Sequence, residues 1–267
     1  MSASLDYDAK RAALLIDLAS RGSIAIAFSG GVDSSVLLHA ANEALGERAV
    51  GVVADSASLP RRELEAARRT AADMGATLVE LRTTEQDDDD YRANRGDRCY
   101  FCKAALFDAL QAYCAEQRIP WMAFGEITDD ALDDRPGARA ASEAGVLAPL
   151  SAAGFGKDDV RRYARDVGMD VADKPASACL ASRIPVGTRV SRERLAQVEA
   201  AENALHDLGL RQVRVRHLGT NARVEVGVDE VARAESLRAE LGDALRGCGY
   251  TAFELAAYRS PVESASH

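Results

Sequence analysis

The run in this sequence that is best equipped for chemistry is Ser29-Gly30-Gly31-Val32-Asp33-Ser34. Its two glycines let the backbone approach a polyanion closely, and its serine hydroxyls add hydrogen-bond donors. A helical pattern begins directly after the glycines, and a helix N-terminus offers free N–H groups and a positive dipole end to phosphate. Asp33 alone would repel phosphate, so its presence predicts a Mg²⁺ ion between the carboxylate and the phosphate oxygens. We therefore interpret the run as a nucleotide-binding loop rather than an ordinary glycine turn.

Three of the five cysteines combine in a way that suits metal chemistry. Cys99-Tyr-Phe-Cys102 is a CxxC pair, which by itself fits a redox pair, half of a zinc site or two packed residues. Cys179 stands in the run 174–183, beside basic residues of the kind that lower the pKa of a thiol. Three thiolates suit a [4Fe-4S] cluster with one open iron, or zinc with a fourth ligand from His or water. The spacing leaves these alternatives open, and we interpret Cys114 and Cys248 as structural.

A group of charged residues in the last third of the chain forms a second candidate site. Arg214 and Arg216 alternate along a strand pattern and therefore share one face, where two guanidinium groups suit a nucleotide phosphate. A solvated strand face is the alternative. Glu202 and Glu225 are candidates for binding a metal or orienting a substrate. His217 is interpreted as a surface histidine.

The elements that would position these residues alternate between strands and helices. Strand patterns at 24–28, 49–55, 77–81 and 121–124 are separated by helical patterns at 34–45 and 58–75. Such alternation predicts an α/β fold with a parallel sheet covered by helices on both faces. Ala54-Asp55-Ser56 closes the second strand, and ligands bind at the carboxyl ends of strands in such sheets. A loop cap is the alternative for these three residues.

The character of the sequence changes after Pro185, which predicts two domains, 1–185 and 186–267. The second domain reads as a small α+β unit with helices at 191–209 and 229–241 and strands between and after them. Residues 85–98 and 126–145 are polar, and we expect both segments to be loops. Trp121 opens an apolar strand and is expected in the core.

The composition narrows the class of protein. The 267 residues are 47% hydrophobic and 28% charged, which is ordinary for a soluble globular protein. The net charge of -9 disfavours non-specific nucleic-acid binding. The sequence has no apolar run long enough to span a bilayer and no signal-peptide pattern, so we expect no membrane partner and a cytoplasmic location.

Several motifs together resemble the LarE-type sulfur transferases, a family of PP-loop ATP pyrophosphatases. The run 29–34 resembles the PP-loop, and it lacks the lysine and spacing of a P-loop, so γ-phosphoryl transfer is not expected. The other motifs cover most of the chain: DRCYFCK (97–103), RPG (135–137), KPASACLASRIPVGT (174–188), RVRH (214–217) and ARVE (222–225).

The resemblance implies a specific activity. Members of the family cleave ATP between the α and β phosphates and adenylate a carboxylate of pyridinium-3,5-biscarboxylic acid mononucleotide. They then convert it to a thiocarboxylate, in the biosynthesis of the nickel-pincer nucleotide cofactor of lactate racemase. Some members sacrifice the sulfur of one cysteine and keep dehydroalanine. Others carry three cysteines that hold a [4Fe-4S] cluster, which delivers an extra sulfide.

Carried over residue by residue, the resemblance implies an adenine nucleotide alpha hydrolase-like fold with ATP and Mg²⁺. The residues implied for ATP are Ser29, Gly30, Gly31, Asp33, Ser34, Ala54, Asp55, Ser56 and Gly125, with Asp33 also catalytic. Cys99, Cys102 and Cys179 match the cluster pattern, and Cys179 corresponds to the sacrificial cysteine. Arg183, Arg214 and Arg216 are implied for substrate phosphate, with Glu202 and Glu225 as metal candidates. We also expect a small nucleotide substrate and a homo-oligomer, whereas the sulfur donor stays open.

Two departures from the family pattern concern the loops around the site. Where relatives often read Asp-Gly-Thr-Asn-Ala-Asp-Asp, this chain has the run 124–130, Phe-Gly-Glu-Ile-Thr-Asp-Asp, and 94–97 lacks the usual prolines. Three other classes remain as alternatives. A tRNA-thiolating PP-loop enzyme would need a basic surface. An amide-forming ligase of the NAD synthetase type would not need the three cysteines. A non-catalytic nucleotide sensor would use them for structural zinc.

Overall fold

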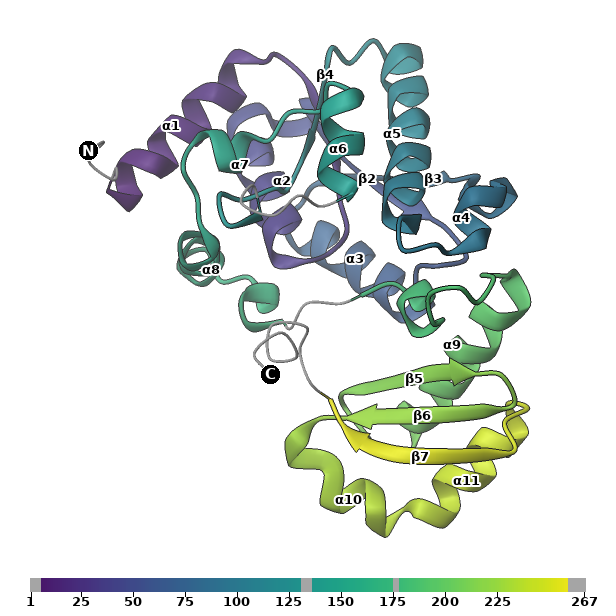
Figure 1. Cartoon of the computed structure of the whole chain (residues 1–267). Coiled ribbons are helices and arrows are strands. Elements are labelled where there is room, and N and C mark those ends of the chain that lie inside the picture. The colour runs from purple at the N-terminus through teal and green to yellow at the C-terminus, as the bar shows by residue number, and fades with distance from the viewer. Residues whose placement is uncertain (1–5, 131–135, 175–177, 259–267) are drawn as a thin grey trace. The chain divides into compact units, whose positions relative to one another are not determined.

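The computed structural model describes residues 6–130, 136–174 and 178–258, and its elements are drawn in Figure 1. Two compact units result: unit 1 is Met1–Tyr91 with Asp97–Ser177, and unit 2 is Arg92–Gly96 with Ala178–His267. The sequence pattern places the start of the second domain at 186, whereas unit 2 begins at Ala178. Residues 178–185 join unit 2 through side-chain bonds. One of these bonds runs from the Asn94 amide to the Pro185 carbonyl, at 2.8 Å.

Unit 1 is an α/β unit, and helix α4 (Asp89–Ala93) spans its division from unit 2. Its strands are β1 (Ile24–Ala27), β2 (Ala49–Asp55), β3 (Thr77–Arg82) and β4 (Trp121–Phe124). Its α-helices are α1 (Tyr7–Ser20), α2 (Val32–Leu45), α3 (Arg61–Asp73), α5 (Arg98–Gln117), α6 (Pro136–Glu143), α7 (Pro149–Ala152) and α8 (Lys157–Asp166). Short 3-10 turns are η1 (Gly46–Arg48), η2 (Glu85–Asp87) and η4 (Asp170–Asp173).

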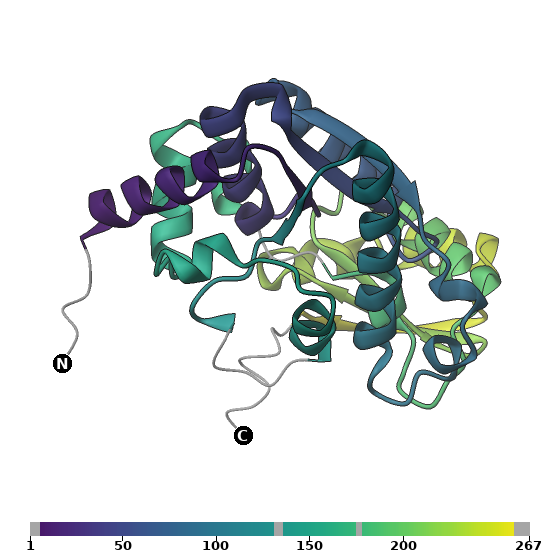
Figure 2. The same cartoon turned by 90° about the horizontal axis from the view of Figure 1, so that it is seen from above.

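The four strands form a parallel sheet in the order β3-β2-β1-β4. Because side chains alternate along a strand, Ile24 and Ile26 of β1 face one core and Ala25 and Ala27 face another. The first core includes α1, α2, α3 and α8, and the second includes α5 and α6. Figure 2 shows this layering, with the purple helices and the teal α5 on opposite sides of the strands. The prediction of a parallel sheet covered on both faces is confirmed.

The strand order creates a binding position. The chain moves from β1 to β2 and β3 in one direction, and β4 is then added on the other side of β1. Open α/β sheets bind ligands at such a switch point, outside the carboxyl ends of the strands. The loop 29–34 follows β1 and Gly125 follows β4, so two of the three predicted ATP-binding segments lie at this point.

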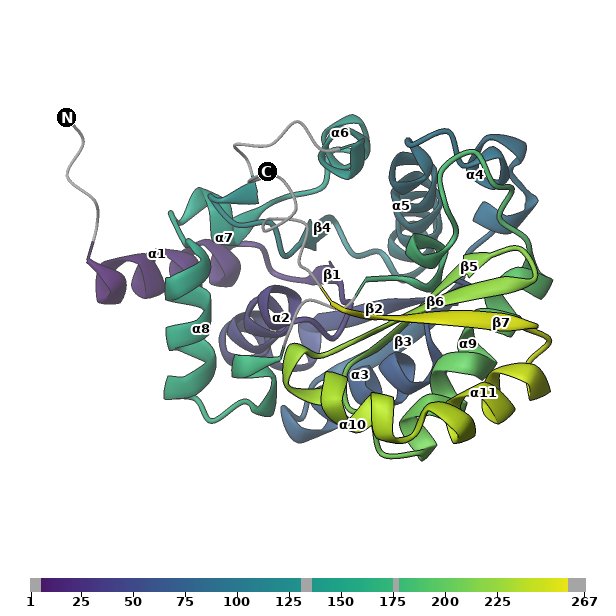
Figure 3. The ribbon, with the colours of Figure 1, turned by 60° about the horizontal axis from the view of Figure 1, so that its bottom comes forward.

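Unit 2 is a small α+β unit built on a three-stranded sheet. Its order is β5-β6-β7, antiparallel between β5 and β6 and parallel between β6 and β7. The strands are β5 (Val213–Leu218), β6 (Asn221–Val226) and β7 (Ala252–Ala257). The helices are α9 (Arg192–Asp207), α10 (Val231–Ser236) and α11 (Arg238–Gly247), with 3-10 turns η5 (Leu180–Arg183) and η6 (Val228–Glu230). One face of the sheet packs on these helices through residues such as Val215 and Val224 (Figure 3).

Several expectations about local structure are wrong. The segment 85–98 is not a simple loop, because it contains η2 and α4 and buries Glu85 and Gln86. The segment 126–145 contains α6. Trp121 is 39% exposed on the edge strand β4, and the Arg21 guanidinium lies over its ring at 4.9 Å. His217 is 5% exposed because it shares the inward face of β5 with Val215, and its ring nitrogen bonds the Tyr250 hydroxyl at 3.2 Å.

Among the described residues, none of the helices combines the length and the apolar character that a membrane crossing requires.

Candidate active site

The loop between β1 and α2 is held in shape by its own serines. The Ser34 hydroxyl lies 3.1 Å from the Ser29 hydroxyl, accepts from the Ser29 amide at 3.2 Å and donates to the Gly31 carbonyl at 3.1 Å. Gly31 is the N-cap of α2 and has no side chain to cap the helix. The first amides of α2 are therefore left without a side-chain cap, as an anion site requires.

Two glycines allow close approaches that no other residue permits. Gly30 has a φ of +69°, and a Cβ added there would stand 3.0 Å from the Cβ of Ala67 in α3. A Cβ added to Gly125 would stand 2.7 Å from the backbone nitrogen of Ser34. The chain after β4 therefore packs directly on the first turn of α2, which brings Gly125 against the predicted ATP-binding loop 29–34.

The carboxyl group of Asp33 lies in an environment that disfavours its charge. Burial and the nearby charge of Asp130 raise its pKa to about 6, although the cations Lys157 and Arg161 act in the opposite direction. Two carboxyl groups at one place suit a hard divalent cation with oxygen ligands. The residues present therefore fit a Mg²⁺ ion, which would supply charge neutralisation to a bound polyphosphate.

The raised pKa of Asp33 predicts a measurable pH dependence of stability. The folded protein binds this proton more tightly than the unfolded chain, so Asp33 lowers the free energy of unfolding as the pH rises from 3.8 to about 6. Asp33→Asn should remove this dependence of stability on pH. At pH 7.5 it should raise the free energy of unfolding by about 1 kcal/mol, a value that allows for the partial exposure of the carboxyl group to solvent. Urea unfolding of the wild type and of Asp33→Asn at pH 3.5 and 7.5 measures this. If the two free energies of unfolding differ by the same amount at both pH values, the prediction is contradicted.

The end of β2 carries the other predicted ATP-binding residues. The Arg61 guanidinium pairs with the Asp55 carboxylate at 2.5 Å and donates to the Ser56 carbonyl at 2.7 Å. The Ser56 hydroxyl accepts from the Ser58 amide at 3.1 Å. Ala54, Asp55 and Ser56 thus form an ordered turn at the carboxyl edge of the sheet, beside β1 and its loop.

A lysine that the sequence analysis did not single out stands next to the CxxC pair. Cys99 and Cys102 lie in the first turn of α5, and Lys103 follows them. The Lys103 ammonium lies over the rings of Phe124 at 4.9 Å and Phe107 at 5.6 Å. Burial lowers its pKa, while the charges of Cys102, Glu126 and Asp130 act in the opposite direction.

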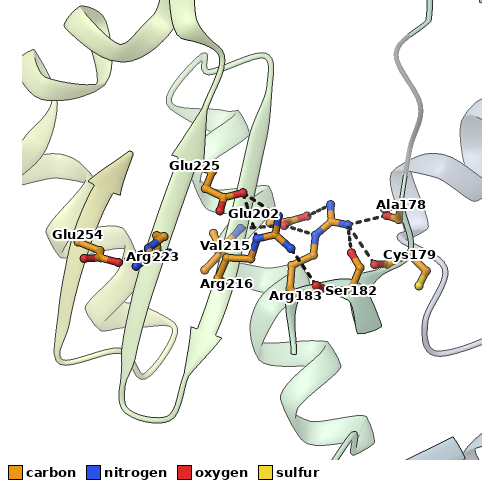
Figure 4. Close-up of polar contacts among 10 residues, drawn as sticks. All are labelled: Ala178, Cys179, Ser182, Arg183, Glu202, Val215, Arg216, Arg223, Glu225 and Glu254. Carbon is orange, nitrogen blue, oxygen red and sulfur yellow. Dashed lines mark hydrogen bonds and ion pairs between the residues drawn. The ribbon is translucent and has the colours of Figure 1, made fainter. Parts of the chain in front are cut away.

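In unit 2, Arg183 organises the backbone that carries Cys179. Its guanidinium donates to the carbonyls of Ala178 at 2.6 Å and Cys179 at 3.0 Å, and it pairs with the Glu202 carboxylate at 2.8 and 3.2 Å. Glu202 also accepts from the Val215 amide of β5 at 2.9 Å. Figure 4 shows these bonds, with the Cys179 sulfur directed away from the guanidinium. The arrangement fixes the Cys179 peptide and leaves its thiol outside the network.

The second and third arginines continue this network. Arg216 donates to the Ser182 carbonyl at 2.9 Å and binds the Glu225 carboxylate at 2.9 and 3.0 Å. Arg214 lies over the Tyr258 ring at 4.1 Å, and its pKa is lowered by burial and by the charges of Arg183 and Arg216. Three guanidinium groups therefore gather in unit 2, a charge arrangement that suits an anion.

Because Arg183 is 5% exposed and Glu202 6% exposed, their ion pair predicts a large stability effect. Glu202→Gln leaves a buried guanidinium without its counter-charge and should lower the free energy of unfolding by about 3 kcal/mol. The exposed pair between Arg223 and Glu254 in the same unit is a matched control. Glu254→Gln should change stability by less than about 1 kcal/mol. Chemical denaturation measures both, and similar losses in the two variants would contradict the argument.

The structure brings the predicted residues together in two groups rather than one. Unit 1 holds the ATP candidates with Cys99 and Cys102, and unit 2 holds Cys179, Arg183, Arg214, Arg216, Glu202 and Glu225. Arg135 and residues 175–177 of the family motifs lie outside the described residues. Within the described part of the chain, no group of three His, Cys, Asp or Glu side chains is arranged to hold a metal ion. Sequence reasoning gave no role to Lys103, and it considered Lys174 only as one of the basic residues beside Cys179, although both lysines stand inside motifs that it quoted.

The fold and its first loop define a class of protein. A parallel sheet whose first strand leads through Ser-Gly-Gly into a helix is the PP-loop nucleotide-binding architecture, and residues 10–95 match the asparagine synthase family model, which shares it.

Similarity to known proteins extends along most of the chain. A pyridinium-3,5-bisthiocarboxylic acid mononucleotide synthase of Lactiplantibacillus plantarum is 33% identical over 94% of this chain and 92% of its own length. An uncharacterised protein of Synechocystis is 39% identical over 77% of this chain and 77% of its own length. An uncharacterised protein of Methanocaldococcus jannaschii is 26% identical over 89% of this chain and 91% of its own length. The chain belongs to the LarE-type sulfur transferase family.

Proposed function

We propose that this protein uses ATP to adenylate a carboxylate of pyridinium-3,5-biscarboxylic acid mononucleotide and converts it to a thiocarboxylate. The observation that carries the proposal is the match, over nearly the full length of both chains, to a synthase of the bisthiocarboxylic acid mononucleotide. The geometry of the PP-loop and of the Cys179 segment supports it. The product would serve the nickel-pincer nucleotide cofactor.

The first step activates a poor electrophile. A substrate carboxylate oxygen attacks the α-phosphorus of ATP, and the bond to the β-phosphate oxygen breaks so that pyrophosphate leaves. The uncapped amides at the start of α2 and the Ser29 and Ser34 hydroxyls bind the phosphates. Asp33 would hold a Mg²⁺ ion, which would neutralise phosphate charge, and Ala54, Asp55, Ser56 and Gly125 shape the nucleoside side of the site.

The second step replaces AMP by sulfur. A sulfur nucleophile attacks the acyl carbon and AMP leaves with the bonding electrons. Arg183, Arg214 and Arg216 bind the substrate phosphate, whereas Glu202 and Glu225 hold two of these guanidinium groups in place. Because Arg183 binds the carbonyls on either side of the Cys179 amide, it fixes the backbone from which the Cys179 thiol acts.

We favour a [4Fe-4S] cluster as the immediate sulfur source. Cys99 and Cys102 lie three positions apart in the first turn of α5, a spacing at which both thiols share one helix face. With Cys179 they make the three thiolates that leave one iron of a cluster open, and the cluster would supply an extra sulfide. The cytoplasmic location stays a prediction; in such a reducing compartment, cysteines are more often metal-bound, catalytic or buried than disulfide-linked. A homo-oligomer also stays a prediction.

Iron analysis tests the cluster. Protein purified anaerobically and reconstituted with iron and sulfide should hold about four irons per chain and absorb in the visible. Cys99→Ala, Cys102→Ala and Cys179→Ala should each lose that iron, and Cys248→Ala should keep it. If the protein holds no iron after reconstitution, the cluster route is contradicted and sacrifice of Cys179 takes its place. In that route the acyl group passes to the Cys179 sulfur, a base removes the Cα proton, and the Cβ–S bond breaks to leave dehydroalanine.

Substrate comparison tests the function itself. Release of pyrophosphate should depend on pyridinium-3,5-biscarboxylic acid mononucleotide and should not be supported by tRNA. Pyrophosphate release that instead requires tRNA, or ammonia-dependent amide formation, would contradict the proposal in favour of the thiolating or ligase alternatives.

A further inference from the structure

Lys174 lies near the C-terminal end of the unit 1 sequence, and its side chain contacts the PP-loop. Its ammonium donates to the Gly30 carbonyl at 3.2 Å and to the Glu63 carboxylate of α3 at 2.8 Å. The side chains of Lys174 and Glu63 are 22% and 25% exposed, so the pair is largely removed from solvent while still open to a ligand. None of the steps described above uses this lysine.

Helix α3 holds both the loop and the lysine. Ala67 contacts Gly30 so closely that a Cβ on the glycine would stand 3.0 Å from the Ala67 Cβ. Glu63 lies one helical turn before Ala67 and therefore on the same face of α3. The face of α3 that packs on the PP-loop thus also carries the carboxylate that keeps the Lys174 ammonium beside the loop.

The loop needs a cation that its own residues do not provide. Residues 29–34 contain no basic side chain and carry the Asp33 carboxyl group, while the ligand is a polyanion. Lys157 and Arg161 act on the charge of Asp33, whereas Lys174 is bonded to the loop backbone itself. A lysine ammonium is a compact charge on a flexible stem, so it can exchange a carboxylate partner for a phosphate oxygen by rotating its last bonds.

We propose that Lys174 binds the β- and γ-phosphate oxygens of ATP and remains bound to them in the leaving pyrophosphate. During adenylation, the electron pair of the breaking bond moves from the α-phosphorus to the bridging oxygen of pyrophosphate. The Lys174 ammonium stabilises that charge without giving up a proton, and Glu63 is its partner when no nucleotide is bound. The catalytic part of this inference rests on the proposed adenylation, but the binding of pyrophosphate does not.

Calorimetric titration of the full chain with magnesium pyrophosphate and, separately, with AMP tests the proposal. Lys174→Gln should weaken pyrophosphate binding by about tenfold or more, because it removes a charge-assisted hydrogen bond. AMP lacks the β and γ phosphates, so its affinity should change by less than about twofold. Lys174→Arg keeps the charge and should recover most of the affinity for pyrophosphate. Glu63→Gln removes the competing carboxylate and should bind pyrophosphate at least as tightly as the wild type.

Three results would overturn the proposal. Unchanged pyrophosphate binding in Lys174→Gln would mean that the ammonium does not reach the phosphates. Equal losses for pyrophosphate and AMP, without recovery in Lys174→Arg, would mean that the lysine only holds the loop. Weaker pyrophosphate binding in Glu63→Gln would likewise make the ion pair a structural support. If Lys174 binds pyrophosphate as proposed but the wild type releases none with the pyridinium acid, the proposed function fails and this inference about binding stands.

Discussion

Asp33→Ala is expected to abolish the release of pyrophosphate from ATP while leaving the protein folded. Asp33 is the carboxylate of the PP-loop and lies near Asp130 at the switch point of the sheet, and it would hold a Mg²⁺ ion that neutralises phosphate charge. Without the Asp33 carboxylate, the negative charge that develops on the leaving pyrophosphate is no longer neutralised. We expect the rate to fall by at least about a thousandfold. Pyrophosphate release in the presence of the pyridinium acid measures this directly.

The fold should survive because the Asp33 charge disfavours rather than supports the folded state. Its pKa is raised by burial, so the alanine variant should unfold at the same denaturant concentration as the wild type or a higher one. Asp73→Ala is a control, since Asp73 is an exposed aspartate at the end of α3. Retained ATP cleavage in a folded Asp33→Ala protein would remove Asp33 from the active site.

Cys179→Ala should separate the two halves of the reaction. The PP-loop residues and their bonds lie in unit 1 and do not include this thiol, so pyrophosphate release should continue. Formation of the thiocarboxylate should fall below detection, because both the cluster and the sacrificial route need the sulfur of Cys179. Quantifying pyrophosphate and thiocarboxylate in the same reaction gives the two readings.

Cys248→Ala is the matched control for this variant, because Cys248 also lies in unit 2 and its hydrogen bonds to Gln197, Ala244 and Leu245 are made by its backbone atoms. It should retain both activities. The two CxxC variants then discriminate the routes: they stop thiocarboxylate formation if a cluster is required and leave a single turnover intact if Cys179 is sacrificed. Continued sulfur transfer in Cys179→Ala would place the sulfur chemistry on another residue.

Much of unit 1 could be predicted because its signals are local. β1, β2 and β3 are apolar runs with turn signals between them, and the glycines of the PP-loop stand directly after β1. Short polar helices could not be predicted in this way. α4 and α6 have five and eight residues, and helices of that length depend on tertiary contacts rather than on intrinsic propensity.

The misplaced side chains have equally specific reasons. His217 alternates with Arg216 along β5, so the pattern that puts the arginines on one face puts the histidine on the buried face. Trp121 is apolar, but β4 is an edge strand, and Arg21 covers its ring instead of the core.

The electrostatic part of the site was the least accessible from sequence. Arg183 and Glu202 are 19 positions apart, and only the fold of unit 2 shows that they form one buried pair. Lys174 and Gly30 are 144 positions apart. In contrast, ligation of one cluster by Cys99, Cys102 and Cys179 still rests on the sequence pattern, because these thiols belong to different units.

The most direct test of the central claim is the mass of the substrate after reaction. Protein carrying its sulfur source is incubated with ATP, Mg²⁺ and pyridinium-3,5-biscarboxylic acid mononucleotide, and the small molecules are analysed by mass spectrometry. We predict a product in which sulfur replaces a carboxylate oxygen, formed together with equal amounts of AMP and pyrophosphate. Recovery of the unchanged acid while ATP is cleaved, or cleavage of ATP to ADP, would contradict the account.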